Sequence, residues 1–530
     1  MSSLEPVLLE GKWQAASSCG EFQALNPATG ELLERRFPVS DWSDCDRALE
    51  AAAQAADELR AISPEVLARF LEAFALAIEQ QATELAELAA IETGLPFAPR
   101  LKDVELPRTV NQLRVAAHAA REESWALPTI DTKANIRSCL AAIGPVVTIG
   151  PNNFPLAFNG ASGGDFAAAV AAGNPVIIKA HPAHPRTTQR LAELAFVASQ
   201  AVQLPPATIQ LLYRLRHADG ERLVSDRRVG ATGFTGGRST GLQLKAAADR
   251  AGKPIYLEMS SINPVVILPA AIAERGSALA EEFCSSCLMG AGQFCTNPGF
   301  VLLIEGPQLA DFVDAVRERF RTSPAGTLLA PVVRDSLAES TARLVAAGAQ
   351  LLAGGQPEPS PRIAFANTLL VIAGRQFLAA PDLFQTEMFG PSTLLVIAQS
   401  TGEAVQILKQ LEGNLTGTIF TPNSGGNQAE YDAIAAALRP RVGRLLNNKM
   451  PTGVAVSPAM NHGGPFPSTG HPGFTAVGIP ASIRRFAMLQ CFDNVAQDRL
   501  PPLLRDEASG SAWRLIDGQW TRGKVERSDS

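Results

Sequence analysis

The sequence predicts an α/β protein of more than one domain, and two observations support this. From about residue 145, short apolar runs alternate with helix-like segments, and such strand–helix–strand alternation favours a parallel sheet with helices on both faces. The chain has 530 residues, more than one hydrophobic core of ordinary size organises, so we expect two or three domains. Apolar residues make up 46% of the chain, which is enough to fill those cores.

The first part of the chain is predicted to be helical, and the alternation starts after it. Pro64 and Gly94 mark the limits of one long helix there. The alternation then predicts strands that end in polar turns, and a second series follows from residue 265. The predicted helices are 44–60, 64–92, 103–121, 161–172, 186–201 and 307–321, and the predicted strands are 146–150, 176–180, 209–213, 265–269 and 300–305.

Composition excludes several classes of partner and location. The net charge of −6 argues against nucleic acid, because phosphate binding needs a basic face. The sequence has no run of about 18 apolar residues, so we expect no membrane span. The first residues lack the basic and apolar parts of a secretory signal. The seven cysteines, an odd number, favour reduced thiols in a cytoplasm.

A glycine-rich segment, VGATGFTGG at 229–237, raises the question of a dinucleotide site. The ordinary fingerprint needs a strand before the loop and an acidic residue about 20 positions later. The preceding residues are a poor strand, and Asp249 lies inside a helical pattern, so the simple fingerprint fails. A tight turn before a helix at 239–251 is the alternative. Even so, Gly236 and Gly237 would let a phosphate approach the N-terminus of that helix.

Three residues are candidates for catalysis, and each has a plainer alternative. Cys295 lies among small, turn-forming residues, as an exposed nucleophile would, although most thiols are buried in cores. Glu258 ends an apolar strand, where burial would raise its pKa and make it a base, although it could be a surface glutamate. Asn153 stands in a proline-flanked turn, where its amide could donate to an oxyanion or only stabilise the turn.

A second cysteine motif, CSSC at 284–287, could be a redox pair or half of a zinc site. The sequence offers no second CxxC or paired histidine at ligand spacing. The surrounding residues have a helical pattern, which favours packing of Cys284 and Cys287 in a core. We therefore predict no metal site.

Taken together, the candidate stretches resemble the aldehyde dehydrogenase superfamily. The similarity extends from residue 26 to about 493, and the glycine-rich segment is similar to the cofactor loop of that family, with Gly236 and Gly241 as its two glycines. The motifs stand in the family order: PNNFP (151–155), VIIKA (176–180), GFTGGRSTG (233–241), LEMSSINP (257–264), GQFCTNPG (292–299) and TEMFGP (386–391).

The resemblance implies an aldehyde dehydrogenase-like α/β fold of three parts. One small part should add strands to a partner subunit and so build a homodimer or homotetramer. The C-terminal tail, 496–530, is polar and is expected to be a loose end. The expected parts are a Rossmann-like cofactor domain (1–128 and 147–258), a catalytic domain (259–475) and an oligomerisation element (129–146 and 476–495).

The resemblance also implies a mechanism. The Cys295 thiolate attacks the aldehyde, and the Asn153 side chain and the Cys295 backbone N–H hold the oxyanion. Hydride leaves for the nicotinamide, and Glu258 then activates water to hydrolyse the thioester, which releases a carboxylic acid. Glu387 resembles the residue that binds the nicotinamide ribose, with Phe389 packed beside it.

One position governs the expected choice of cofactor. Lys179 resembles the lysine that reaches the adenosine ribose, and NAD-preferring members often have a glutamate three residues later. Here that position is Pro182, preceded by His181, so no carboxylate repels the 2′-phosphate of NADP. Arg214 and Arg216 could pair with that phosphate. We therefore expect NADP to be preferred, with NAD possible.

Three segments of the sequence indicate a subgroup of this family. The segments 105–114, 153–185 and 462–470 resemble those of the α-ketoglutaric semialdehyde (2,5-dioxovalerate) dehydrogenases, which implies 2,5-dioxopentanoate as substrate. Its distal carboxylate requires an arginine, and Arg108 is the candidate, although a helix arginine is usually solvated or ion-paired.

Phe154 and Phe158 are expected to line the substrate tunnel. The alternative is ordinary core, and both can hold at once. The NADP-linked fatty aldehyde dehydrogenases resemble the same subgroup, so fatty or other aliphatic aldehydes remain an alternative substrate. Acyl transfer to CoA is disfavoured by Glu258, because a water-activating base suits hydrolysis. A cofactor-binding protein without turnover is a further alternative, which the presence of Cys295, Glu258 and Asn153 disfavours.

Overall fold

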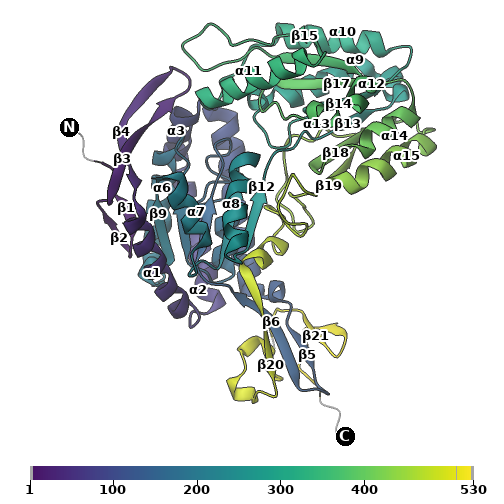
Figure 1. Cartoon of the computed structure of the whole chain (residues 1–530). Helices are drawn as coiled ribbons and strands as arrows, with labels where there is room; N and C mark the ends of the chain where they lie inside the picture. Colours follow the sequence, from purple (N-terminus) through teal and green to yellow (C-terminus); the bar gives the residue numbers. More distant parts are fainter. Residues whose placement is uncertain (1–3, 509, 527–530) are drawn as a thin grey trace.

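The computed structural model describes residues 4–508 and 510–526 and contains four β-sheets (Figure 1). Two seven-stranded sheets form the two large lobes, and a five-stranded sheet forms an arm that projects from them. A three-stranded sheet lies along the outer side of the N-terminal lobe. Alternating strands and helices were the basis for predicting an α/β fold, and that prediction is confirmed.

The first large sheet has the order β12-β11-β7-β8-β9-β1-β2. Its first five strands are parallel, and β1 and β2 extend the edge in antiparallel pairing. Central strands such as VVTI and VIIK are apolar on both faces, because helices cover the sheet on each side. The strands are β12 (Ile255–Glu258), β11 (Ala231–Thr235), β7 (Val146–Ile149), β8 (Val176–Lys179), β9 (Ile209–Leu212), β1 (Val7–Leu9) and β2 (Lys12–Gln14).

In the described part of the chain, eight helices and a small sheet lie around this first sheet. The first helix begins after Asp41. The Asp41 carboxylate accepts a hydrogen bond from the Ser43 backbone N–H at 2.8 Å and so satisfies one of the N–H groups that have no partner within the first turn. The helices are α1 (Trp42–Leu59), α2 (Pro64–Gln80), α3 (Ala82–Thr93), α4 (Leu106–Glu122), α5 (Gly164–Ala171), α6 (Pro185–Ala201), α7 (His217–Ser225) and α8 (Arg238–Arg250), and the small sheet is β10 (Arg214–Leu215), β4 (Glu31–Ser40) and β3 (Ser18–Asn26).

The second large sheet has the order β15-β16-β17-β14-β13-β18-β19, parallel except for β15 at one edge. Two hydrophobic clusters fill its two faces. The strands are β13 (Val265–Ile267), β14 (Phe300–Ile304), β15 (Gln350–Ala353), β16 (Thr368–Ala373), β17 (Ser392–Ala398), β18 (Asn414–Phe420) and β19 (Val442–Asn447), and the helices are α9 (Pro269–Leu288), α10 (Leu309–Thr322), α11 (Pro331–Ala346), α12 (Gly374–Ala379), α13 (Pro381–Phe384), α14 (Thr401–Lys409) and α15 (Gln428–Leu438).

The arm combines two distant parts of the chain. Its order is β20-β6-β5-β21-β22, with β20 paired antiparallel to β6 along seven residues of each strand. The strands are β20 (Ala487–Asp493), β6 (Ile136–Ala142), β5 (Thr129–Asp131), β21 (Arg514–Ile516) and β22 (Gln519–Thr521). Shorter helical turns connect the larger elements: Phe97–Glu105, Ser124–Ala126, Pro206–Thr208, Met289–Gly292, Arg439–Arg441, Ala481–Phe486, Gln497–Arg499 and Pro502–Leu504.

The expectation of a loose C-terminal tail was wrong. Residues 514–521 form the hairpin β21–β22, and β21 pairs with β5 in parallel. The buried Arg137 donates to the backbone oxygen of Leu504 and forms an ion pair with Asp506 at 2.6 Å, which fixes the intervening segment. The polar composition concealed this, because the tail has few apolar side chains, although Leu504 and Ile516 are buried in the hydrophobic core.

Two further predictions needed correction. The helix expected at 64–92 is two helices, because the backbone at Gln81 leaves the helical region at φ −108° and ψ 17°. The glycine-rich segment 229–237 is not all loop, since its residues 231–235 form β11. Gly233 stands in that strand where an added Cβ would lie 2.5 Å from the Asp165 side chain, so the close approach of α5 explains the glycine.

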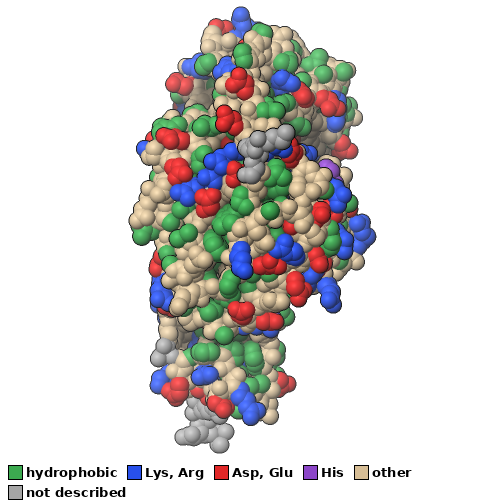
Figure 2. All heavy atoms as spheres, turned by 90° about the vertical axis from the view of Figure 1, so that its left-hand side faces the viewer, with side chains coloured by type: hydrophobic (Ala, Val, Ile, Leu, Met, Phe, Trp, Pro, Cys, Tyr) green, Lys and Arg blue, Asp and Glu red, His purple; other side chains and the backbone are tan. Residues whose placement is uncertain are grey.

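The surface carries charges of both signs (Figure 2). Over the face in Figure 2, basic and acidic side chains interleave. Among the described residues, none of the helices has the length and hydropathy to cross a bilayer.

Candidate active site

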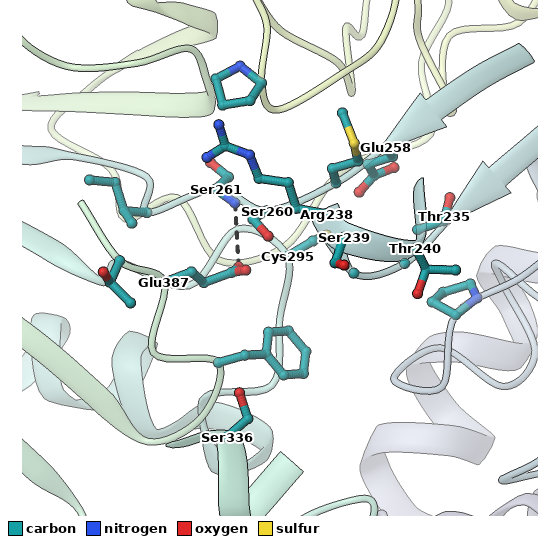
Figure 3. A pocket seen from close by; sticks show the side chains of 18 of the residues that line it. Thr235, Arg238, Ser239, Thr240, Glu258, Ser260, Ser261, Cys295, Ser336 and Glu387 are labelled. Carbon is teal, nitrogen blue, oxygen red and sulfur yellow. Dashed lines mark hydrogen bonds between the residues drawn. The ribbon is translucent and has the colours of Figure 1, made fainter. Parts of the chain in front are cut away.

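A cavity of about 920 Å³ lies where the two large lobes meet. Its walls come from the turn after β7, the β11–α8 turn, the end of β12, the loop that holds Cys295 and the loop at 386–389 (Figure 3). The strands β7, β11 and β12 are parallel neighbours, so their carboxyl ends meet at one edge of the sheet. This edge is the usual ligand site of open parallel sheets.

Cys295 lines this cavity from the segment between α9 and β14. Asn263 holds that segment, since its Nδ2 donates to the backbone oxygens of Cys295 and Asn297, both at 2.9 Å. Burial and the nearby Glu258 carboxylate raise the pKa of the Cys295 thiol well above its ordinary value, while Arg108 opposes the rise. The thiol therefore needs a base close by to become a nucleophile.

Glu258 is the last residue of β12, and the structure buries it rather than leaving it at the surface. Its Oε1 lies 2.9 Å from Nε2 of His462, and the same Nε2 lies 3.5 Å from the Cys295 sulfur. A carboxylate oxygen only accepts, so Nε2 carries the hydrogen in the contact with Glu258. The other oxygen, Oε2, is buried without a hydrogen-bond partner among the described residues. The three side chains thus form one connected group.

His462 is a site residue that sequence reasoning missed. The segment HGGPFPSTG at 462–470 was informative only as a subgroup marker, and a lone histidine carries no signal for a role. Only the fold brings it beside residues more than 160 positions earlier in the chain.

The Asn153 side chain also faces the cysteine loop. Its Nδ2 donates to the backbone oxygen of Gln293 at 3.0 Å, which uses one of its two N–H groups and leaves the other. The Arg100 guanidinium donates to the Asn153 backbone oxygen at 3.0 Å and so fixes the turn. Asn153 lines the same cavity as Cys295 and Glu258, so the three predicted catalytic residues lie together.

The β11–α8 turn forms another wall of the cavity. An added Cβ at Gly236 would lie 2.8 Å from the Phe234 ring, and one at Gly241 would lie 3.1 Å from the Met259 sulfur, so both glycines allow α8 to pack closely. At Gly237 an added Cβ would meet no described atom within 4 Å. The turn therefore leaves open space at the N-terminus of a 13-residue helix, a site suited to phosphate.

Arg238, the first residue of α8, has its guanidinium bound by the protein and not free to bind a phosphate. Its guanidinium forms a bidentate ion pair with Glu412 at 2.8 and 3.1 Å. Arg238 therefore contributes a contact between the two lobes.

Glu387 and Phe389 line the cavity from the second lobe. Burial raises the pKa of Glu387 to about 7, although its carboxylate accepts a hydrogen bond from the Ser261 backbone N–H at 3.3 Å (Figure 3). A buried carboxyl beside an open cavity is well placed to accept hydrogen bonds from hydroxyl groups of a ligand.

Lys179 ends β8, in register with Ile149 of β7, two residues before Pro151 of the cavity wall. Burial, together with the positive charge of Arg214, lowers the pKa of Lys179 to about 8. Arg216, by contrast, pairs with Asp219 at 2.8 Å. Arg214 is therefore the arginine whose charge reaches Lys179.

Arg108 forms no ion pair among the described residues and is only partly exposed to solvent. Its guanidinium lies 4.9 Å from the Phe158 ring and 5.6 Å from the Phe154 ring, and its Nε and Nη2 are buried without hydrogen-bond partners in the described chain. Burial lowers its pKa. Phe154 and Phe158 belong to an aromatic cluster with Phe294 and Phe474, so they are core residues that surround this guanidinium.

Cys284 and Cys287 are buried in α9 within a hydrophobic cluster, and burial raises the pKa of both thiols. All seven cysteines of the chain are free.

The fold and this cavity define an oxidoreductase of the α/β class. Residues 13–474 match the aldehyde dehydrogenase family, and the chain belongs to that family and acts on aldehydes. It is 39% identical to α-ketoglutaric semialdehyde dehydrogenase 2 of Azospirillum brasilense, over 97% of this chain and 98% of the relative. It is 34% identical to α-ketoglutaric semialdehyde dehydrogenase of Acinetobacter baylyi, over 96% and 97%.

Solved structures share the fold. PnpE in complex with nicotinamide adenine dinucleotide superposes with a TM-score of 0.80 at 22% identity, covering 93% of this chain and 99% of that one. Lactaldehyde dehydrogenase from Escherichia coli gives a TM-score of 0.78 at 21% identity, covering 92% and 98%.

Proposed function

We propose that this chain oxidises 2,5-dioxopentanoate, or α-ketoglutaric semialdehyde, to 2-oxoglutarate, preferably with NADP. The observation that carries the proposal is the partly buried Arg108 guanidinium, whose Nε and Nη2 are buried without a hydrogen-bond partner in the described chain. A carboxylate is the group that such a guanidinium pairs with best. The names of the two relatives above support the same substrate.

A fatty or other aliphatic aldehyde is the second candidate, and the aromatic cluster around Phe154 and Phe158 favours it. Its hydrocarbon chain would leave the charge of Arg108 buried and unpaired, which weakens binding. The guanidinium therefore favours the dicarboxylic semialdehyde.

The chemistry begins at Cys295. The Glu258 carboxylate takes up the thiol proton, because Nε2 of His462 already carries a hydrogen, and the thiolate attacks the aldehyde carbon to give the oxyanion of a hemithioacetal. The free N–H of the Asn153 amide and the Cys295 backbone N–H donate to the oxyanion, a contribution of roughly 10²–10³ in rate per donor. A nicotinamide cofactor, when bound, would supply the acceptor for the hydride that leaves that carbon.

A thioester on Cys295 then remains to be hydrolysed. Glu258 returns its first proton to solvent and takes a second from water, whose oxygen attacks the thioester carbon. The C–S bond breaks, Cys295 leaves as thiolate and the carboxylic acid is released. Oε2 of Glu258, buried without a partner in the described chain, is the atom we assign to that water.

The residues around the cavity fit a dinucleotide. Its volume of about 920 Å³ and the open space at Gly237 suit a pyrophosphate at the N-terminus of α8. Glu387 would hold the nicotinamide ribose, with Phe389 beside it, and Lys179 the adenosine ribose.

The preference for NADP rests on charge near Lys179. The next residues, His181 and Pro182, offer no carboxylate that would repel a 2′-phosphate. Arg214 is the better candidate for pairing with that phosphate, because Arg216 already pairs with Asp219.

Self-association is part of the proposal. β20 is an edge strand, and its Met488 and Leu489 are 47% and 67% exposed. An exposed edge of this kind suits pairing with a second subunit in a homodimer or homotetramer. A cytoplasmic location, which the seven free thiols favour, completes the proposal.

Steady-state kinetics of the purified protein test the function. 2,5-Dioxopentanoate and a long-chain aldehyde would each be assayed with NADP and with NAD, beside Cys295→Ala. We expect the highest kcat/KM for the dioxo acid with NADP, and no turnover in the variant. A preference for the long-chain aldehyde would refute the substrate, and a strong preference for NAD would refute the cofactor assignment.

A further inference from the structure

We propose that Cys295, His462 and Glu258 form a binding site for Zn²⁺ that inhibits the enzyme. One ligand atom from each residue lies within 4.8 Å of the other two. A thiolate, an imidazole and a carboxylate are the ligand types that Zn²⁺ takes from proteins, whereas Mg²⁺ and Ca²⁺ prefer oxygen ligands alone. The proposal depends on this geometry and is independent of which aldehyde the enzyme oxidises.

The spacing fits tetrahedral coordination. Zn²⁺ binds sulfur at about 2.3 Å and imidazole nitrogen at about 2.0–2.1 Å, which places the two ligand atoms ~3.5 Å apart in a tetrahedron. The Cys295 sulfur and His462 Nε2 are 3.5 Å apart. His462 Nε2 and Glu258 Oε1, at 2.9 Å, need to separate by only ~0.4 Å for a cation to replace the hydrogen between them.

Burial adds a second, independent indication of a ligand. The side chains of Glu258 and His462 are each 1% exposed, and Glu258 Oε2 has no hydrogen-bond partner among the described residues. A buried carboxylate oxygen without a partner is costly, and a bound cation removes that cost. Cys295 and Glu258 line the large cavity, so a water molecule can reach the fourth position from there.

Zinc at this site would block both the attack on the aldehyde and the hydrolysis of the thioester. Binding forms a Zn–S bond, and the thiol proton of Cys295 leaves to solvent. His462 stays neutral and changes tautomer: Nε2 releases its proton to bind the ion, and Nδ1 takes one up from solvent. The nucleophile Cys295 and the Glu258–His462 pair are then held by the same ion. Cys295 therefore cannot attack the aldehyde, and no base remains to activate water. Inhibition should be reversed by a chelator and should compete with the aldehyde.

Cobalt provides a direct test without any substrate, because Co²⁺ occupies zinc sites and its spectrum reports the ligands. Titration of the full chain should give one thiolate-to-cobalt charge-transfer band and the intense visible bands of tetrahedral Co²⁺, at one ion per chain. Cys295→Ser should abolish the charge-transfer band. His462→Asn and Glu258→Gln should each weaken binding at least ~10-fold, since even outer-shell changes cost that much.

The exposed thiols provide the matched control. Cys19 and Cys491 are exposed, and the double variant Cys19→Ser/Cys491→Ser should retain the full cobalt spectrum. In a second readout, Zn²⁺ should protect Cys295 from alkylation by iodoacetamide, as judged by mass spectrometry, until a chelator is added.

Either of two results would overturn the site: unchanged Co²⁺ affinity in both His462→Asn and Glu258→Gln, or loss of the spectrum in the double variant. If His462→Asn fails to fold, Glu258→Gln, which keeps the shape of the side chain, decides alone. Turnover measured in the presence of a chelator tests the proposed function separately.

Discussion

The replacement Arg108→Met tests the proposed substrate most directly. Methionine keeps an unbranched apolar stem between Phe154 and Phe158 and removes the guanidinium. Arg108 has no ion pair in the described chain, so the replacement breaks no salt bridge within the protein. What it removes is the partner of the substrate carboxylate.

The expected loss follows from the burial of that pair. Truncating one member of a buried, hydrogen-bonded charge pair costs roughly 2–5 kcal/mol. Taking about 3 kcal/mol, kcat/KM for 2,5-dioxopentanoate should fall ~150-fold. An aliphatic aldehyde of similar length has no carboxylate to lose a partner, and the replacement removes the unpaired charge that weakens its binding, so its kcat/KM should not fall. The melting temperature should not fall, because a buried charge without a partner has been removed.

Arg100→Met is the matched control. The Arg100 guanidinium lies 4.4 Å from the same Phe154 ring, but it pairs with the buried Glu105 and binds the Asn153 backbone. Its replacement should lower kcat/KM for both aldehydes by similar factors and should destabilise the protein. Equal losses for both aldehydes in Arg108→Met as well would contradict the assignment of Arg108 to the carboxylate.

Three further predictions concern the oxyanion, the cofactor and the tail. Asn153→Ala should lower kcat by roughly 10²–10³ with little change in the KM for NADP, and an unchanged kcat would exclude the amide as a donor. Because the pKa of Lys179 is about 8, the KM for NADP should rise as the pH passes above that value and Lys179 loses its charge. In Lys179→Arg, steady-state titration should show no such rise, since arginine stays charged. Removing 496–530 should lower the melting temperature in thermal denaturation by several degrees, because the buried Arg137 loses Asp506; an unchanged value would show that the hairpin adds no stability.

The sequence was sufficient for the parts of the fold that local pattern controls. Apolar runs such as 146–149 and 176–179 are strands with polar ends, and their carboxyl ends meet at one edge because the strands are parallel. Cys295, Glu258 and Asn153 were therefore predictable as neighbours once their motifs were recognised. Their roles in the reaction remain a proposal, as do the division into domains and the assignments of the cofactor residues.

The sequence could not predict whether the Arg108 side chain is solvated or buried. On a helix such as α4, an arginine is expected to be solvated, and whether it is depends on what packs over it. The rings that cover it come from the turn after β7, about 50 residues later in the chain. Burial of a charge is therefore a property of the tertiary contact, which no local pattern records.

His462 shows how the fold completes a site that motifs only begin. Thr469 forms a short antiparallel bridge with Glu258 at the end of β12, and the Met259 backbone N–H donates to the Ser468 oxygen at 2.8 Å. These backbone contacts carry the segment across from the second lobe and place the imidazole between the carboxylate and the thiol. Since main-chain atoms make these contacts, side-chain identity at 468 and 469 does not encode them. A replacement of His462 alone thus changes the Glu258–His462 pair and leaves the backbone bridge between Thr469 and Glu258 intact.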